Sequence, residues 1–289
     1  MRFVEYCAAK AVIASLRVLP LSIARPLAYF YARLLDTAIP RLRRIAYRNL
    51  AFALPAADPR AITDGVFMSI ARIILVFSRF PSISRDNVSD WIRYEGLEHF
   101  IEAKRRGKGV LFATAHLGNW ELSAFAHSLM TEPMHVVVRA LDNPRIDRIV
   151  ESRRSLSGNS IIHKTDAARA ILRALGRNEA VGILIDQNAS LDEGVFVDFF
   201  GVPACAGVAF ARIANHTGAA VIPGFALWSE TENRYVLRFY PIIEMTGDER
   251  IDTARIHSHL EAVIREHPDQ WLWIHRRWKT RPPDAPPIY

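Results

Sequence analysis

The alternation of short apolar runs with helical stretches after residue 95 is the feature that most limits how this chain can fold. The apolar runs cover residues 109–115, 134–138, 160–162, 180–186, 219–225 and 235–243. The helical stretches that separate most of them, or follow the last, cover residues 119–130, 143–156, 165–176, 205–217 and 249–266. This alternation predicts an α/β fold with a largely parallel central sheet flanked by helices. The runs are almost continuously apolar, as expected of strands covered on both faces.

The first 60 residues differ from the rest of the chain in charge and in secondary structure. They contain ten Arg or Lys residues and three acidic residues, and this difference of seven equals the whole net charge of +7. Apolar and aromatic residues lie between the arginines, and residues 1–80 are expected to be helical. A basic, strongly apolar helical segment is typical of binding to an anionic membrane surface and not to nucleic acid. A helix pair packed on the main domain is the alternative interpretation.

Three regions are expected along the chain. Residues 1–40 form membrane-associating helices, residues 41–280 form the main domain, and residues 281–289 form a Pro-rich tail. Arginines and prolines interrupt the first apolar stretch, so it lacks the roughly 20 consecutive apolar residues of a membrane span. We therefore expect peripheral or shallow insertion. The two cysteines, without a CxxC pair, favour a reduced, cytosol-facing compartment.

His116 ends the first apolar run, and active sites of parallel sheets lie beyond the carboxyl ends of their strands. Gly118 permits a turn, and Asn119 is a good N-cap for a helix that begins with Trp120 and Glu121. In that arrangement Glu121 reaches back and accepts a hydrogen bond from one imidazole nitrogen. The other nitrogen is then free to take a proton from a hydroxyl. The pattern predicts acyl transfer to an alcohol, and a hydrogen-bonded polar residue at a strand end is the alternative.

Other chemistries have weaker signals. The sequence contains no G-x-S-x-G motif of a serine hydrolase and no HExxH motif, and its other histidines lack metal-ligand spacing. We expect no metal site and no cofactor beyond an acyl thioester co-substrate.

Five sequence blocks then occur in order. They are HLGNWE, VVVRALDNPRIDRIV, ILIDQN, VDFFGVPACAGVAFARIANHTGAAVIP and HPDQWLWIHRRWK. Together they resemble the lipid A biosynthesis lauroyl/myristoyl acyltransferase family of bacteria, within the lysophospholipid acyltransferase-like superfamily. The resemblance runs from about residue 40 to about residue 280, and RRIAYRNLAFALP at residues 43–55 adds to it.

The resemblance implies roles for particular positions. His116 would be the general base and Glu121 its charge partner. Further positions would contact substrate: Gly118, Asn119, Arg139, Asn143, Arg154 and Asp186. Two roles are open for Arg139: it contacts an anion or oxyanion, or it is a solvated arginine after a strand. Two roles are also open for Asp186: it lies near the polar groups of the acceptor, or it caps the loop 187–194. The tryptophans after residue 270 are interpreted as lipid-headgroup contacts or as a cap on the sheet.

The function implied by the resemblance is O-acyl transfer from acyl carrier protein or coenzyme A to a hydroxyl of a membrane glycolipid, a lipid A precursor. The cytoplasmic face of the bacterial inner membrane is the expected location. Transfer to another glycolipid or a lysophospholipid, and a non-catalytic lipid-binding protein on the membrane surface, are the alternatives.

Overall fold

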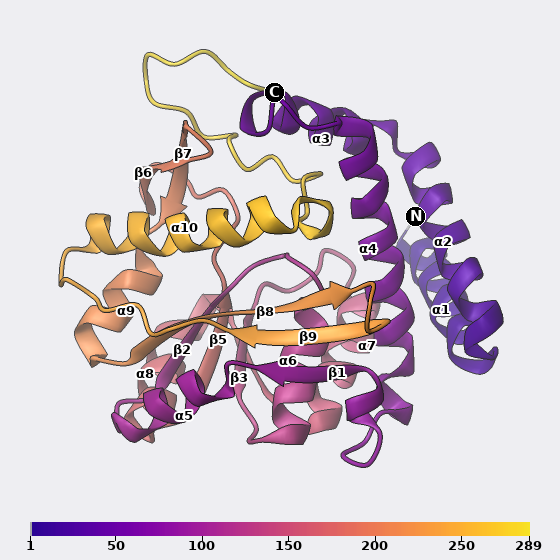
Figure 1. Cartoon of the computed structure of the whole chain (residues 1–289), viewed down its shortest axis with the longest axis horizontal. Helices are drawn as coiled ribbons and strands as arrows, with labels where there is room; N and C mark the ends of the chain where they lie inside the picture. The colour runs from indigo at the N-terminus through magenta and orange to yellow at the C-terminus, as the bar shows by residue number, and fades with distance from the viewer. Residues whose placement is uncertain (1) are drawn as a thin grey trace.

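The centre of the molecule is a seven-stranded sheet with the strand order β1-β9-β8-β2-β5-β3-β4 (Figure 1). The computed structural model describes residues 2–289, apart from the side chain of Asp166. The strands are β1 (Ile92–Glu95), β2 (Val110–Thr114), β3 (His135–Val138), β4 (Ser160–His163), β5 (Ala180–Leu184), β8 (Ala220–Ser229) and β9 (Arg234–Phe239). Only β8 and β9 pair antiparallel, and the other neighbours in the sheet pair parallel. The predicted α/β fold with a largely parallel sheet is confirmed.

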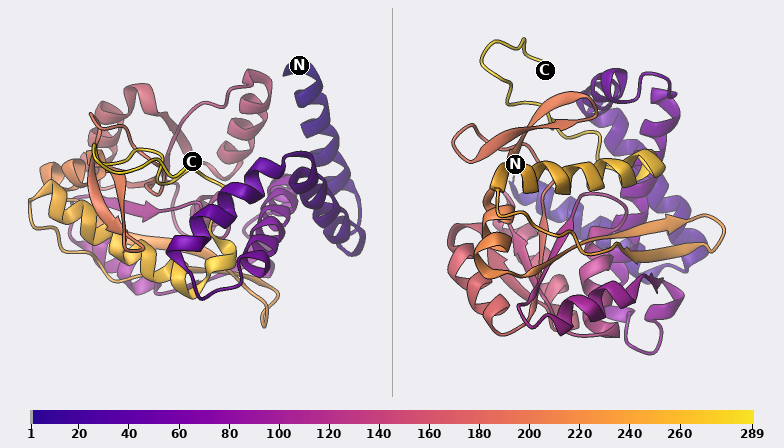
Figure 2. Two further views of the ribbon diagram at one scale, coloured as in Figure 1. Left: turned by 90° about the horizontal axis from the view of Figure 1, so that it is seen from above. Right: turned by 60° about the vertical axis from the view of Figure 1, so that its left-hand side comes forward.

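Helices cover both faces of this sheet (Figure 2). One face carries α5 (Leu97–Arg105) and α6 (Trp120–Met130), and the other carries α8 (Ala167–Gly176), α9 (Ala209–Thr217) and α10 (Glu249–Glu266). Strand β2 shows how the sequence produces two cores. Val110 and Phe112 pack with α5 and α6, whereas Leu111 and Ala113 pack with α8, α9 and α10, because alternate side chains point to opposite faces.

Two parts of the strand pattern differ from the prediction. Strand β1 and the antiparallel hairpin of β6 (Gly194–Phe199) and β7 (Val202–Gly207) were not expected. The helix predicted over residues 205–217 begins only at Ala209, because Cys205 pairs with Phe196 in the hairpin. Helix α7 (Pro144–Arg154) and α10 agree with the helices predicted at 143–156 and 249–266.

Four helices precede the sheet and stand beside it (Figure 1). They are α1 (Arg2–Val18), α2 (Leu21–Ala38), α3 (Pro40–Ala53) and α4 (Pro59–Arg79), so the helical prediction for this region is confirmed, with Met1 outside the described residues. Small residues of α2, including Ala24 and Ala28, pack against Phe67, Ala71 and Leu75 of α4. The short alanine side chains let the two helices approach closely.

Helix α4 is the most apolar of these four. Asp58 caps it by accepting a hydrogen bond from the backbone N–H of Arg60. Within the described residues, the stretch Pro59–Ser82 alone is long and apolar enough to cross a membrane by length and composition, and this fits a membrane-associating region. However, 67% of its most apolar window is buried inside the protein.

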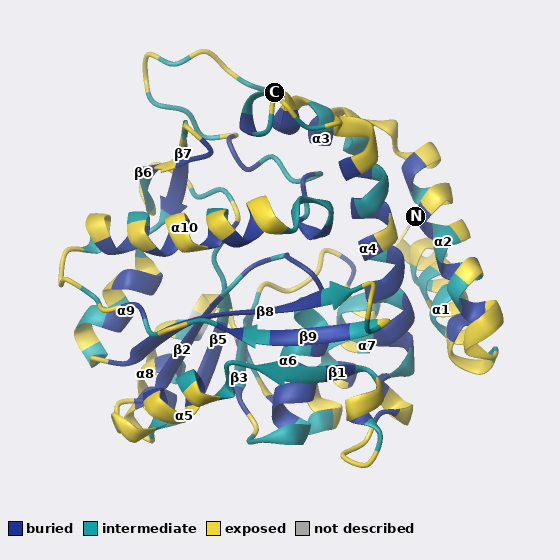
Figure 3. Ribbon diagram, in the orientation of Figure 1, coloured by how far each residue is buried: buried dark blue, intermediate teal, exposed yellow. Residues whose placement is uncertain are grey.

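Helices α1 and α2 carry a group of exposed apolar side chains, and Figure 3 shows that both helices are exposed over much of their length. The large ones in this group and just after it are Phe3, Val4, Val18, Leu21, Ile23, Phe30, Leu34 and Ile39. Exposed arginines and a lysine lie among them: Arg2, Lys10, Arg17 and Arg33. Apolar side chains in a group of this kind mark a surface that contacts another molecule or a membrane.

The chain directly after α10 is packed into the protein interior. Trp271, Trp273 and Trp278 are almost completely buried and pack with Phe199 and Phe200. They therefore form part of the core, which agrees with the interpretation as a cap and not with lipid-headgroup contacts. The tail at 281–289 returns to α3, where the hydroxyl of Tyr289 donates to Oδ1 of Asn49 over 2.5 Å. Figure 1 shows the C-terminus beside α3.

Candidate active site

The turn between β2 and α6 is held on two sides. Gly118 has a φ of +60°, and a Cβ atom there would lie 2.0 Å from the carbonyl oxygen of Ala226, so the position requires glycine. The backbone N–H of Gly118 donates to Gln270, and that of Asn119 donates to Ala226. The side chain of Asn119 accepts from the N–H of Leu122 over 3.0 Å and so caps α6 as predicted.

His116, in this turn, contacts the carboxylate of Asp186. Its Nδ1 lies 2.9 Å from Oδ1 of Asp186, and its backbone N–H donates to Oδ2 over 3.0 Å. The register of the sheet explains the contact. Thr114 of β2 lies opposite Leu184 of β5 in a parallel pair, so the residues two positions further along each strand also meet.

Trp271 completes this arrangement from a distant part of the sequence. Its indole Nε1–H donates to Oδ2 of Asp186 over 2.9 Å. The backbone carbonyl of His116 in turn accepts from the N–H of Leu272. Asp186 is only 3% exposed, and its two oxygens receive three hydrogen bonds, which offset the cost of burying the charge.

The carboxylate controls the protonation of the imidazole. Burial alone would lower the pKa of His116, but the charge and hydrogen bond of Asp186, with a smaller contribution from Glu121, raise that pKa above its ordinary value. For Asp186, burial alone would raise the pKa. The charge of His116 and the hydrogen bonds from His116 and Trp271 nevertheless bring the pKa of this carboxyl below its usual range. The pair therefore stabilises an imidazolium beside a carboxylate. Nε2 of His116 has no hydrogen bond within residues 2–289, and the ring is part of a cavity wall.

The predicted hydrogen bond between Glu121 and His116 is wrong. The carboxylate of Glu121 accepts two hydrogen bonds from Arg154, from Nη2 over 2.5 Å and from Nε over 2.8 Å. Arg154, the last residue of α7, reaches the first turn of α6, where the side chain of Glu121 lies. The parallel register gives Asp186 the place beside Nδ1, so Glu121 acts on His116 only through its charge.

A cavity of about 860 Å³ opens at His116. Thr114 and Phe112 precede His116 at alternate positions of β2 and line the same cavity, so it follows the strand for about 13 Å at roughly 3.3 Å per residue. Ala124 and Phe125 of α6 form part of the opposite wall. Aromatic side chains of Phe112, Phe125 and Phe239 make part of the lining apolar. Glu121, Arg154 and His116 are among the polar residues of the lining. The cavity thus suits a long apolar chain with a reactive polar end.

The far part of the cavity depends on glycines in two strands. A Cβ on Gly182 of β5 would lie 2.7 Å from Cε of Met134, and one on Gly224 of β8 would lie 2.8 Å from the ring of Phe239. All four residues line the cavity. Because these glycines have no side chains, the side chains of Met134 and Phe239 can lie against the two strands and form the wall of this part of the cavity.

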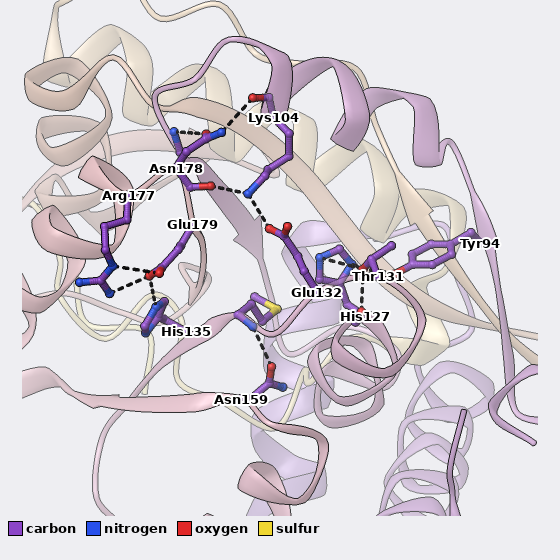
Figure 4. A network of polar contacts seen from close by, with 12 residues as sticks. Tyr94, Lys104, His127, Thr131, Glu132, His135, Asn159, Arg177, Asn178 and Glu179 are labelled. Carbon is purple, nitrogen blue, oxygen red and sulfur yellow. Dashed lines mark hydrogen bonds and ion pairs between the residues drawn. The ribbon is translucent and has the colours of Figure 1, made fainter. Parts of the chain in front are cut away.

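The apolar end also contains a buried histidine whose hydrogen bonds are internal. Nδ1 of His127 lies 2.7 Å from the hydroxyl of Tyr94 and 3.0 Å from that of Thr131 (Figure 4). Burial, with the charge of Lys104, lowers the pKa of His127 to about 3, so the ring is neutral. Lys104 is held nearby by Glu132 and Asn178. A neutral ring surrounded by aromatic side chains closes the cavity without placing a charge beside an apolar ligand.

The remaining predicted residues lie in different places. Arg139 is at the cavity rim, with 81% of its side chain exposed, 3.6 Å from Asp142. Asn143 is outside the described cavity lining, because its side chain caps α7 by accepting from Arg145 and donates to the carbonyl of Arg2. Gly118 and Asn119 are also outside that lining and shape the turn instead. Within the described residues, no group of three or more His, Cys, Asp or Glu side chains is arranged to hold a metal ion.

Asp186 was predicted from the sequence as a site residue, but not as the hydrogen-bond partner of His116. The hydrogen bond from Trp271 to Asp186 was not predicted. One signal was present in the predicted strands. Both His116 and Asp186 come directly at the ends of apolar runs, and the carboxyl ends of neighbouring parallel strands meet at the same edge of a sheet.

A parallel α/β sheet in which a histidine paired with an aspartate lines a large, partly apolar cavity is the architecture of an enzyme suited to lipid-like substrates. Comparison with known proteins names the family. The family model of bacterial lipid A biosynthesis acyltransferases matches residues 2–280, and the chain belongs to that family. It is an acyltransferase.

Individual relatives are similar over most of their length. The chain is 26% identical to the lipid A biosynthesis lauroyltransferase of Escherichia coli K12 over 86% of this chain and 83% of the relative. It is 27% identical to the palmitoleoyltransferase of the same organism over 91% of this chain and 88% of the relative. A lipid A biosynthesis acyltransferase of Haemophilus influenzae is 23% identical over 83% and 76% of the two chains.

The pKa of His116 is expected to fall in the Asp186→Asn variant, because loss of the carboxylate charge leaves burial as the larger influence. Titration of the imidazole signals by NMR, with His116 assigned by their absence in His116→Ala, measures the midpoint. Asp142→Asn, which removes an exposed carboxylate, is the matched control and should leave the midpoint in place. A midpoint that stays or rises in Asp186→Asn would show that Asp186 does not control this histidine.

Proposed function

We propose that this protein transfers a fatty acyl chain from a thioester to a hydroxyl of a lipid A precursor, with His116 as the general base. The observation that carries the proposal is the orientation of His116. Nδ1 is held by Asp186, while the ring lines the cavity and Nε2 has no partner within the described residues. An imidazole fixed at one nitrogen and open at the other is the arrangement that general-base catalysis requires.

The proposed reaction needs no covalent intermediate on the protein. Nε2 of His116 takes the proton of the acceptor hydroxyl, and the oxygen attacks the thioester carbonyl carbon. The tetrahedral intermediate then releases the thiolate, which takes the proton back from the imidazolium. An ester and a free thiol result, so atoms and charges balance. Asp186 stabilises the imidazolium between these two proton transfers.

Glu121 and Arg154 support this step in a different way. Glu121 is held by Arg154 and adds negative charge near His116, which helps to raise the pKa of the imidazole. Arg154 lines the same cavity, and a guanidinium there is suited to stabilise the developing oxyanion. Glu121 is therefore proposed as a positioning residue for Arg154 and a charge partner of His116, with Asp186 as the orienting carboxylate.

The acceptor and the donor are proposed from the family and from the rim. The relatives are named for lipid A biosynthesis, which makes a lipid A precursor the proposed acceptor. Arg139 and Lys164 lie at the rim with mostly exposed side chains. Both acyl carrier protein and coenzyme A carry phosphate on the arm that bears the thioester, and these cations are placed to bind it. Because a thioester is already activated, the proposed step requires no metal or further cofactor.

The N-terminal helices are proposed to hold the enzyme on the cytoplasmic face of the bacterial inner membrane. Their outer faces combine the exposed apolar side chains of α1 and α2 with arginines and lysine. That combination inserts shallowly into an anionic leaflet.

The variant His116→Ala should lose acyl transfer by about 10²- to 10⁴-fold, the usual contribution of a general base. The measurement is mass spectrometry of the acylated lipid A precursor, with acyl carrier protein and coenzyme A thioesters in separate reactions. His216→Ala, which changes an exposed histidine of α9, is the control and should keep normal turnover. Near-normal turnover of a folded His116→Ala protein would contradict the proposal.

The variant Gly182→Ala should shift the enzyme toward shorter acyl chains, because the new methyl group displaces Met134 into the far part of the cavity. Each lost methylene contact is worth about 0.8 kcal/mol, so a chain two carbons too long should be used roughly tenfold less well. Competition between thioesters of different length measures the preference. Gly176→Ala, whose Cβ would meet nothing within 4 Å, is the control. An unchanged length preference would place the acyl chain elsewhere.

Binding to vesicles should weaken more than tenfold when Ile23 and Phe30 of α2 are both changed to Asp. Burial of each apolar side chain is worth about 1.5–3 kcal/mol, and the added charges are repelled by anionic lipid. Sedimentation with phosphatidylglycerol-containing vesicles measures the binding. The control pair is Leu191→Asp with Ile251→Asp, which are as exposed but distant in the sequence. Equal losses in both pairs would argue against α2 as the membrane contact.

A further inference from the structure

A second cavity, of about 390 Å³, lies between α2, α4 and the turn that joins β8 to β9. Its lining shares no residue with that of the catalytic cavity. Figure 1 shows the β8–β9 turn beside α4, with α2 on the outer side of that helix. The salt bridge from Arg72 of α4 to Glu230 of the turn closes this arrangement over 2.5 Å.

Two side chains that line this cavity contain a buried hydrogen-bond donor without an acceptor. Nε of Arg72 and Nε1 of Trp228 are buried and have no partner within the described residues. Arg72 is only 8% exposed, and its guanidinium lies 4.6 Å from the ring centroid of Trp228. A buried donor without an acceptor costs roughly 1–3 kcal/mol, so a ligand that accepts hydrogen bonds would be stabilised at these two groups.

The charges of the lining favour an anion. Arg25, Arg72 and Arg234 line the cavity, against the single carboxylate of Asp90. Arg72 is paired with the carboxylate of Glu230, whose side chain is 73% exposed, while its own Nε has no partner within the described residues. Within the described residues the side chain of Arg25 donates to Asn233 alone, over 3.3 Å, whereas that of Arg234 contacts Glu232 and the carbonyl of Ser89. The guanidinium groups of Arg25 and Arg72 can therefore offer a phosphate several N–H donors.

Part of the remaining lining is apolar and adjoins the exposed residues of α2. Leu21, Ala28, Leu75 and Val76 line the cavity, and Leu21 belongs to the exposed apolar group of α1 and α2. The volume of about 390 Å³ holds a headgroup and the adjoining part of a lipid, but not two whole acyl chains. A ligand that fits therefore places its anionic end inside and leaves its chains along α2.

We propose that this cavity binds the phosphate headgroup of an anionic membrane lipid, with Arg72, Arg25 and Trp228 as its donors. The site is separate from the catalytic cavity and does not depend on the proposed reaction, so His116→Ala should leave its binding unchanged. A lipid bound there would fix α2 and the β8–β9 turn against α4 at the membrane surface.

The test is isothermal titration of the full chain, purified in a neutral detergent, with dihexanoyl phosphatidylglycerol. Arg72→Gln and Arg25→Gln should each weaken binding at least tenfold, and Trp228→Phe should weaken it severalfold. Arg60→Gln removes the same charge from an exposed position of α4 outside the cavity and should change binding less than twofold. Thermal melting of each variant establishes that it is folded. Should Arg72→Gln not fold, Arg25→Gln and Trp228→Phe decide the matter.

Two further ligands show whether the site recognises an anionic lipid headgroup or free phosphate. Dihexanoyl phosphatidylcholine, which carries no net charge, should bind at least tenfold more weakly than the phosphatidylglycerol. Inorganic phosphate should bind far more weakly than the lipid, because it makes no apolar contacts. Equal binding of phosphatidylcholine, or unchanged binding in the Arg72→Gln and Arg25→Gln variants, would overturn the proposal. Inorganic phosphate that binds as tightly as the lipid would assign the site to free phosphate instead.

Discussion

The buried carboxylate of Asp186 is the interaction on which the rest of the site depends. An isolated carboxylate in the protein interior costs several kcal/mol, and this one is stabilised by three donors from two segments of the chain. His116 supplies two of them from the end of β2, and Trp271 supplies the third from the segment after α10. The turn after β2, the sheet and the C-terminal segment therefore share one polar centre. Trp271 is buried in the same core as Phe199 and Trp278, which fixes the position of the carboxylate.

The charges around His116 favour the protonated ring. Asp186 and Glu121 are negative and Arg154 is positive, so with a neutral imidazole the group carries a net charge of −1. Protonation of His116 brings that sum to zero. This agrees with the raised pKa of His116, and it would stabilise the imidazolium that the proposed abstraction of a proton from an alcohol produces. The two carboxylates thus have different tasks, one through a hydrogen bond and the other through its charge and its contact with Arg154.

The sequence determined the fold class, because the alternation of apolar runs and helices is a local property of each segment. It also placed His116 and Asp186 correctly at strand ends and Asn119 as a helix cap. It did not determine which carboxylate meets the imidazole, since that depends on the register between β2 and β5 and on Arg154 arriving from α7. Asn143 illustrates the same limit. An asparagine before a proline is a good cap in any helix, and here that local role takes its side chain out of the cleft.

Helix α4 joins the membrane-associating region to the catalytic domain. Its residues Arg72, Leu75 and Val76 line the second cavity, while Phe80, just after its end, stacks on Phe125 of α6 at 4.0 Å between ring centroids. Phe125 is also part of the wall of the catalytic cavity. The alanine-rich face of α2 is buried against the same helix. Since α2 and α4 share one core, residues 1–40 pack directly on the part of the chain that follows. A ligand held between α2 and α4 would therefore act on a helix that lines the second cavity and is followed by Phe80, which contacts a wall residue of the first.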